Sequence, residues 1–408
     1  MRFTISALLL CAASTVHANG FVLNDHGAQA TGRAGAVVAT VDNGSAVVHN
    51  PGGVAVTEGT NVYVGASLIL ASSTFTEDGT GIDTDTQSPP AVTPTIYVTS
   101  RVHELVTVGL GFHTPFGSSI KWPHESPGAD EVTTNTLRTY FITPVVGVNL
   151  GKFVPGLTIG AGLDLVPSSV LIEQDIWFGQ DTGSASLGGT AFGLGGRIGV
   201  MYRPASLPRL SVGAAWRSAV QLDFAGVGDF DAPAPYRAQL PPDGSITAML
   251  TLPQTLSAGV AYRPIDNLEL EVDAIYMGWS AVDHIDLVLP DDSTTVLPRD
   301  YEDTVSVRAG VEYSIPGKHL DVRAGYTYDP TPVPAHRLTM ALPDKDRHNI
   351  TAGLSYHLQE SKYVVDFGLL WVLPSDRATA DELPDEPALK GTYAVNALVT
   401  ALSLGAKF

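Results

Sequence analysis

Apolar and polar side chains alternate along most of this chain from about residue 60 to its end. Between residues 268 and 274 aliphatic side chains occupy the even positions and carboxylates the odd ones. Residues 303–313 and 319–328 repeat the pattern with one apolar and one polar side. A period of two residues predicts β-strands, each with one apolar face.

The pattern predicts fourteen strands, joined alternately by short connections and by longer ones of about 15 to 25 residues. An even number of antiparallel strands with short turns at one end and long loops at the other is typical of bacterial outer-membrane barrels. The predicted strands are residues 61–74, 92–101, 105–114, 136–149, 157–172, 189–202, 209–224, 250–262, 268–283, 303–313, 319–328, 347–358, 363–374 and 391–408.

Two features favour a transmembrane β-barrel over a large soluble sandwich or propeller. Tyr202, Tyr262, Tyr313 and Tyr356 each precede a short connection, as expected for an interfacial aromatic girdle. The chain ends in alternating apolar residues that close on Phe408, a form that resembles the signal read by the barrel-assembly machinery. Only a closed barrel lets strands satisfy their backbone groups in lipid.

The first 18 residues are predicted to be a cleaved signal peptide. Arg2 precedes a short apolar run, and the small-residue pattern ending at Ala18 is typical of a cleavage site. The only cysteine, Cys11, lies inside this segment, so the mature chain is predicted to have no disulfide and no thiolate chemistry. No later segment offers the roughly 20 consecutive apolar residues of a transmembrane helix.

The composition fits an exported barrel. Only 16% of the 408 residues are charged, 41 are Gly, and the mean hydropathy is +0.13, which implies a large core or a lipid-facing surface. The formal charge of -19 argues against nucleic acid as a partner, because phosphate binding requires clustered Lys and Arg.

The alternation predicts that the polar faces of the strands line the lumen. Opposed charges there either form cross-strand ion pairs that stabilise the barrel or make a track for a passing ligand, and ion pairing is the favoured interpretation. The predicted lumen charges are Arg197, Arg217, Glu269, Glu271, Asp273, Arg308, Glu312, Asp321 and Arg323, with Asp164 as a further member.

Residues 19–58 do not alternate and are rich in Gly and Ala, with a turn at Asn50, Pro51 and Gly52. The segment has too many apolar residues and too few charges for a disordered tail. We therefore predict a hatch (plug) inside the lumen of a barrel formed by residues 59–408.

Short motifs along the whole mature chain resemble the FadL/TodX (OmpP1-like) family of outer-membrane transporters for long-chain fatty acids and other hydrophobic compounds. They include Gly20-Phe21-Val22-Leu23, Gly32-Arg33-Ala34-Gly35, Asp42, Ser45 and Asn50-Pro51-Gly52-Gly53, and later residues 111–117, 252–264, 268–280 and 323–348. The resemblance implies a fourteen-stranded barrel with a hatch, ligand capture at extracellular loops, an internal apolar pocket, and sideways exit where the third strand is kinked. It also implies that Asn50, Pro51 and Gly52 help to shape the ligand route, although Gly52 stands where the family has Ala.

Two sets of residues are candidates for these steps. A third-strand kink is expected around Gly109, Gly111, Pro115, Phe116 and Gly117, although Pro115 could equally just end the strand. Candidates for loop capture are Ile120, Trp122, Phe230 and Tyr236, which could also pack on neighbouring loops.

No catalytic motif, metal motif or cofactor-binding motif is recognisable. The Gly-rich run at residues 193–199 lies in a strand and is not expected to bind nucleotide. Acidic loop pairs, such as Asp291 with Asp292, are expected to be solvated charge rather than sites for Ca²⁺ or for bridges to lipopolysaccharide. We therefore predict a monomeric outer-membrane transporter of fatty acids, in contact with lipid and lipopolysaccharide. The alternatives are an aromatic-hydrocarbon transporter, a general porin or a barrel enzyme.

Overall fold

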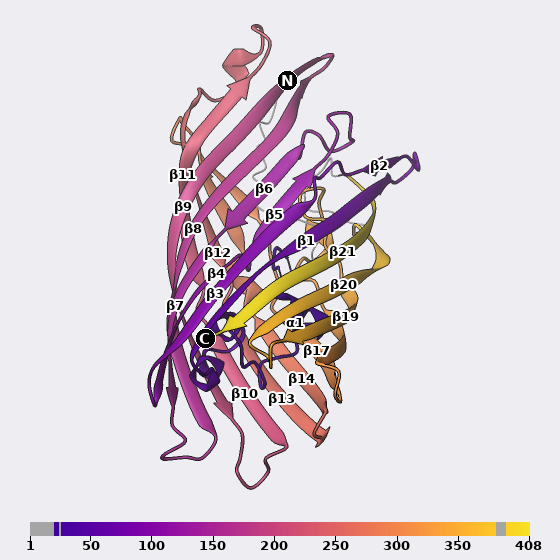
Figure 1. The fold of residues 1–408 in the computed structure, drawn as a ribbon. Coiled ribbons are helices and arrows are strands. Elements are labelled where there is room, and N and C mark those ends of the chain that lie inside the picture. Colours follow the sequence, from indigo (N-terminus) through magenta and orange to yellow (C-terminus); the bar gives the residue numbers. More distant parts are fainter. Residues whose placement is uncertain (1–19, 24–25, 381–388) are drawn as a thin grey trace.

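The computed structural model describes residues 20–23, 26–380 and 389–408, and these form a closed antiparallel β-barrel (Figure 1). The first strand, β1 (Thr60–Glu77), pairs with the last, β21 (Gly391–Lys407), from Asn61 opposite Lys407 to Glu77 opposite Gly391. This pairing removes both sheet edges. The predicted signal peptide lies outside the described residues.

The predicted fourteen strands are confirmed, although several of them are interrupted. In chain order they are β1 (Thr60–Glu77), β3 (Ala91–His103), β4 with β5 (Val106–His113, Gly117–Lys121), β6 with β7 (Thr134–Thr139, Phe141–Asn149), β8 (Leu157–Phe178), β9 (Asp181–Tyr202), β10 with β11 (Leu210–Arg217, Val220–Asp231), β12 with β13 (Gly244–Leu252, Thr255–Ile265), β14 with β15 (Leu268–Met277, His284–Val288), β16 with β17 (Thr294–Pro298, Thr304–Ile315), β18 (Leu320–Asp329), β19 (Arg347–Leu358), β20 (Tyr363–Ala378) and β21 (Gly391–Lys407).

The short elements lie in loops or in the segment before β1, residues 20–23 and 26–56, which is called the first segment below. They are α1 (Ala28–Gly32), α2 (Ala46–His49), η1 (Pro51–Val56), β2 (Asp83–Asp85), η2 (Arg237–Gln239), η3 (Trp279–Ala281) and η4 (Ala335–Arg337). None of the helices among the described residues is both long and apolar enough to cross a membrane.

The prediction of a long loop between the fifth and sixth strands, at residues 173–188, is wrong. Residues 173–188 continue β8 and β9, which are joined by a tight turn after Phe178. Small and polar residues such as Ser184, Ser186 and Gly188 hide the apolar alternation there. The two longest strands, β8 and β9, therefore form one hairpin that extends toward the long-loop end (Figure 1).

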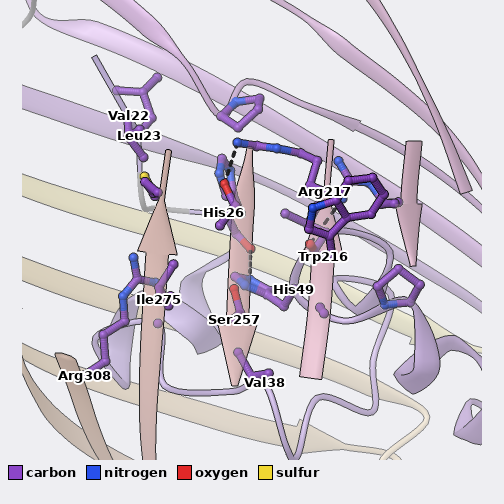
Figure 2. A pocket seen from close by; sticks show the side chains of 18 residues that line it. Val22, Leu23, His26, Val38, His49, Trp216, Arg217, Ser257, Ile275 and Arg308 are labelled. Atoms are coloured by element: carbon purple, nitrogen blue, oxygen red, sulfur yellow. Dashed lines mark hydrogen bonds between the residues drawn. The ribbon is translucent and has the colours of Figure 1, made fainter. Parts of the chain in front are cut away.

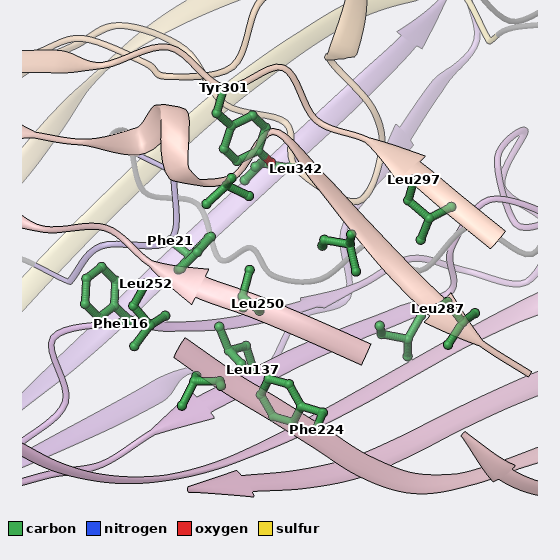
Figure 3. Packing of buried hydrophobic residues seen from close by; sticks show 14 of the residues in the cluster. Phe21, Phe116, Leu137, Phe224, Leu250, Leu252, Leu287, Leu297, Tyr301 and Leu342 are labelled. Atoms are coloured by element: carbon green, nitrogen blue, oxygen red, sulfur yellow. The ribbon is translucent and has the colours of Figure 1, made fainter. Parts of the chain in front are cut away.

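The inward face of the strands changes character along the barrel. On β14 the inward residues Glu269, Glu271 and Asp273 are followed by Ile275 and Met277, all of them buried. Toward the long-loop end the inward residues of neighbouring strands are also apolar, and they form one cluster with residues of the first segment (Figure 3). The expectation that the lumen is polar is therefore correct only for the half near the short turns.

Residues 20–23 and 26–56 are mostly buried and contact the inward faces of the strands. A belt of inward glycines permits this packing, because a Cβ atom at these positions would collide with the backbone of residues 28–55. The belt consists of Gly147, Gly160, Gly199, Gly213, Gly310, Gly325, Gly353 and Gly368. Glycine is needed at these positions because main chain packs directly on main chain.

Candidate functional site

A cavity of about 100 Å³ lies where the first segment meets the strands of the lumen (Figure 2). Its apolar lining includes Val22, Leu23, Ile275 and Met277. Three arginines, Arg197, Arg217 and Arg308, supply its cationic lining. The cavity therefore combines apolar walls with positive charge.

Arg217 is the cation best placed to bind an anion. Its Nη2 donates to the Pro253 carbonyl (3.3 Å) and to Thr255 Oγ1 (2.8 Å). Its guanidinium lies over the Phe116 ring, and it forms no ion pair with a carboxylate of the described residues. Its Nε is buried and makes no hydrogen bond within the described structure. The side chain is half-buried, and a partly desolvated cation without a carboxylate partner is unfavourable, so an anionic ligand here would be favoured.

Arg197, by contrast, is fully engaged. Its guanidinium contacts Asp164 at 2.8 Å and donates to the carbonyls of Val47 and Val48 at 2.9 and 3.2 Å. This side chain therefore ties the sixth strand to the first segment rather than offering a free charge.

Two histidines of the first segment, His26 and His49, complete this side of the cavity (Figure 2). Burial lowers the pKa of His49 to about 4, and burial also lowers the pKa of His26 well below its usual value. Both rings are therefore neutral near pH 7, and the positive charge of the cavity comes from arginine.

The third strand is broken between β4 and β5, beside the cavity. Its pairing with β3 ends at Ile96 opposite Phe112, and β5 pairs only with β6. Residues 21–23 occupy the vacated edge. Leu23 N donates to the Pro115 carbonyl (2.9 Å), and Gly117 N donates to the Phe21 carbonyl (3.0 Å).

The gap begins where β3 and β4 stop pairing, after Ile96 opposite Phe112, and hydrogen bonds close it again further along. Toward the long loops, Gln87 N donates to the Lys121 carbonyl at 2.7 Å, and Lys121 N donates to Ser88 Oγ at 2.9 Å. Phe21 also packs edge-on against Trp279, with ring centres 4.8 Å apart. The first segment thus closes a short opening in the wall with three residues.

The predicted kink residues divide into two groups. Pro115, Phe116 and Gly117 lie at the break or directly after it. Gly109 and Gly111 are paired on both sides, with Thr99 and Tyr97 of β3 and with Val145 and Thr143 of β7, so they do not kink the strand. A Cβ atom at either glycine would instead crowd the Val47 side chain.

The predicted lumen charges hold the first segment in place. Arg33 contacts Glu269, Glu271 and Glu312 at 2.9, 3.0 and 3.8 Å. Asp273 accepts the Val37 and Val38 N–H groups at 2.9 and 3.0 Å, and Glu271 accepts from Ala39 N at 2.6 Å. Charge-assisted hydrogen bonds of this kind are stronger than neutral ones.

The remaining charges connect strands. Arg323 contacts Glu312 at 2.5 Å and Asp321 at 3.5 Å. Arg308 lines the cavity. The ion pairs of the lumen therefore lie beside the first segment or between it and the short turns. Arg217 lies where these charges give way to the apolar half toward the long loops.

The turn at Asn50, Pro51 and Gly52 is wedged between the first segment and the barrel. The Asn50 side chain donates to the carbonyls of Val38 (2.7 Å) and Val200 (3.0 Å) and accepts from Gly52 N (3.0 Å). Pro51 begins η1 and lines the cavity, whereas Asn50 and Gly52 do not. Of the three, only Pro51 lies on the cavity surface.

Three of the predicted loop-capture residues are buried. Ile120 and Trp122 belong to a core beneath the loops, where Trp122 Nε1 donates to the Met340 carbonyl (2.8 Å). Phe230 lies in the apolar lumen cluster. Tyr236 is half-buried and stacks on Phe178 with ring centres 4.8 Å apart. They do not form one exposed patch, and their capture role stays a prediction.

No group of three or more His, Cys, Asp or Glu residues that could hold a metal ion occurs in the described part of the chain. Of the acidic loop residues, Asp291 and Asp292 lie on an exposed turn. The cluster at residues 381–386 lies outside the described residues.

Several residues of the site were not predicted from the sequence. Arg33 is a lone cation in a Gly-rich and Ala-rich stretch, and Asp344 lies in a dense run of charges, so both carried a signal. Asp344 Oδ2 accepts from Gly20 N (3.1 Å) and from Thr331 Oγ1 (2.6 Å). Trp279 lies in a stretch that resembles the family, but nothing local indicated its contact with Phe21, which is far away in the sequence.

Comparison with known proteins adds independent findings. The model of the family described as outer membrane protein transport protein (OMPP1/FadL/TodX) matches residues 9–408. A putative outer membrane protein of Neisseria meningitidis serogroup B (NMB0088) is 24% identical and covers 97% of this chain and 96% of its own. The long-chain fatty acid transport protein of Salmonella typhi is 23% identical over 91% of this chain and 92% of its own.

Solved structures share the fold. A FadL homologue of Pseudomonas aeruginosa superposes with a TM-score of 0.85 at 17% identity, covering 95% of this chain and 100% of its own. The toluene transporter TodX of P. putida superposes with a TM-score of 0.76 at 17% identity, covering 94% and 98%.

Proposed function

The chain belongs to the OMPP1/FadL/TodX family of outer membrane transport proteins, and we propose that it takes up long-chain fatty acids through its lumen. The family transports hydrophobic compounds across the outer membrane, and its members include a long-chain fatty acid transport protein and toluene transporters. This chain is therefore an outer-membrane β-barrel, and the choice of cargo is the proposal.

The lumen is suited to a hydrophobic ligand. Its half toward the long loops is lined by one apolar cluster that reaches Phe21, Phe116 and Leu252 near the cavity (Figure 3). Moving an alkyl chain out of water contributes about 0.8 kcal/mol per methylene group. A chain that enters from the loops would lie against this surface with its head at the cavity.

Arg217 is the single observation that favours a fatty acid over an aromatic hydrocarbon. A hydrocarbon would leave the half-buried guanidinium without an anionic partner, whereas a carboxylate would neutralise it. The Phe116 ring and Thr255 Oγ1 already hold the side chain in one place, so little ordering is required on binding.

The proposed exit is sideways, through the break in the third strand. An axial path would have to displace residues 28–56, which are fixed by the buried charges of Arg33, Glu271 and Asp273. Among the described residues, backbone hydrogen bonds and the packing of residues 21–23 close the gap between β3 and β5. A fatty acid gains nothing from entering water, so a path into the membrane is favoured.

The same features argue against the alternatives. A general porin needs a continuous water-filled lumen, whereas residues 20–23 and 26–56 lie inside this one. The family consists of transporters, and we extend that role to this chain in place of an enzymatic one. Contact with lipopolysaccharide, recognition of Phe408 by the barrel-assembly machinery and a monomeric state remain predictions.

Uptake of a radiolabelled long-chain fatty acid tests the proposal. Cells that lack the protein should take up the label more slowly than cells that carry it, whereas toluene uptake should be unchanged. Equal fatty-acid uptake by the two strains contradicts the proposal, and a deficit limited to toluene favours the hydrocarbon function instead. Planar bilayers with the purified protein should show almost no ion conductance, unlike a porin.

A further inference from the structure

The pairing of the barrel strands is interrupted at several further places, and one of them lies between the sixth strand (β9) and the seventh (β10 with β11). β9 pairs with β10 up to Arg197 opposite Arg217, and it pairs with β11 again from Thr190 opposite Ala225. These two pairs are 197 − 190 = 7 residues apart on β9 but 225 − 217 = 8 residues apart on the seventh strand. The register shifts by one residue, and the ladder omits residues 191–196 and 218–224.

The two strands overlap at this seam instead of lying edge to edge. A Cβ atom at the inward position Gly193 would collide with the Val220 side chain and would lie 2.9 Å from the Gln221 carbonyl oxygen. The seventh strand therefore passes across the inner face of β9. At the lower end, Ser218 N donates to the Gly196 carbonyl (2.8 Å), and Gly196 N donates to Ser218 Oγ (2.9 Å).

The outer side of the seam faces the membrane. Phe192 and Leu194 are 61% and 66% exposed and project outward from β9. Opposite them, Gln221 and Asp223 are exposed and joined by a hydrogen bond of 2.9 Å. Exposed apolar residues therefore meet exposed polar ones at the seam, which is the pattern expected near a membrane interface.

The inner side of the seam opens on the ligand path. Val220 and Leu222 cover it and belong to the apolar lumen cluster that contains Phe116. Arg217, directly below the seam, lines the cavity. Unpaired strand edges are costly in lipid unless protein covers them or a cavity requires them, so a seam closed by two aliphatic side chains is a functional candidate.

We propose that this seam is a second lateral passage, through which single-chain hydrophobic molecules move between the outer leaflet and the lumen. The passage opens when the segment that carries Val220 and Leu222 moves inward from Gly193 and Gly195. This inference rests on the proposed transport function, and it is separate from the break in the third strand.

A disulfide across the seam tests the proposal. Gly193→Cys with Val220→Cys places two sulfur atoms where the Cβ position of one residue meets the side chain of the other, and the described residues contain no native cysteine that could interfere. The matched control is Tyr202→Cys with Val212→Cys, which joins the same two strands where they are paired. Uptake of a labelled long-chain fatty acid is measured before and after reduction.

The oxidised seam variant should transport severalfold more slowly than its reduced form, and the control should not change on reduction. A second variant, Val220→Ala, removes part of the inner cover without a cross-link and should speed uptake. Equal rates for the oxidised and reduced seam variant overturn the passage, as does unchanged or slower uptake by Val220→Ala. If cells carrying the wild-type protein show no uptake above cells lacking it, the proposed function itself fails, and this inference fails with it.

Discussion

The guanidinium carbon of Arg217 lies 4.6 Å from the centre of the Phe116 ring. This cation–π contact joins the seventh strand to the edge that is exposed by the break in the third strand. Its contribution is about 1–2 kcal/mol, because Phe116 is buried and Arg217 is half-buried. The charge that we expect to bind a ligand carboxylate is therefore in direct contact with the edge through which we expect the ligand to leave.

Replacing this charge should affect acids and hydrocarbons differently. Arg217→Gln should slow uptake of a long-chain fatty acid about tenfold, because a hydrogen bond to a charged group contributes about 1.5–3 kcal/mol. Toluene uptake should not fall. Arg209→Gln, at an exposed turn, is the control. A purely structural role for Arg217 would instead lower the thermal stability and the transport of both compounds.

The charged anchors should keep the first segment in the lumen. Arg33→Met leaves Glu271 buried without its cation, whereas Glu269 keeps Arg263, and the loss should destabilise the closed state by about 3–5 kcal/mol. Single-channel recording should then show ion currents that are absent from the wild type. Adding Glu271→Gln should reduce these currents, because it removes the uncompensated charge. A silent Arg33→Met channel would contradict this role.

The glycine belt predicts a position-dependent cost of added volume. A Cβ atom at Gly353 would lie 2.8 Å from Gly32 Cα, whereas one at Gly188 would meet nothing closer than 3.8 Å. Gly353→Ala should therefore lower stability by about 1–3 kcal/mol, as overpacking does, and Gly188→Ala should have little effect. Denaturant titration of both variants in liposomes compares them, and equal midpoints would argue against main-chain packing at the belt.

Asp344 predicts a pH dependence. Burial raises the pKa of this loop carboxyl to about 6 from its usual 3.8, although Arg347 opposes the shift. Because the folded pKa is raised, the stabilising contribution of Asp344 is complete below about pH 4 and is lost as the pH rises through 6. The shift of 6 − 3.8 = 2.2 units corresponds to about 3 kcal/mol.

The Asp344→Asn variant isolates this effect, because asparagine cannot ionise. The free energy of unfolding of the wild type is compared with that of this variant at each pH. The stability of the wild type relative to this variant should decline between pH 4 and pH 6 and then level off. Glu125→Gln, on an exposed loop, should run parallel to the wild type. A wild-type curve that rises relative to Asp344→Asn over the same range would reverse the assigned sign.

The sequence predicted the barrel well because alternation reports directly on strands. It also placed Glu269, Glu271 and Asp273 on one inward face, where the structure has them. Alternation does not say what fills the lumen, however. The change to Ile275 and Met277 further along the same strand depends on where residues 20–56 end, which is a tertiary property.

The candidate site was predictable only in part. Pro115 marked the break because proline cannot continue a ladder, whereas Gly109 and Gly111 are paired and serve packing against Val47. Trp122 looked exposed because it lies in a loop, but a second loop covers it. Contacts between residues more than two hundred positions apart leave no local pattern in a single sequence.

Binding of a long-chain fatty acid and of its methyl ester to the purified protein tests the central claim most directly. The two ligands share the alkyl chain and differ in the charge that Arg217 is expected to neutralise. Calorimetry should show at least about tenfold tighter binding of the acid, in line with one charge-assisted hydrogen bond. Equal affinities, or tighter binding of the ester, would contradict a lumen built for fatty acids.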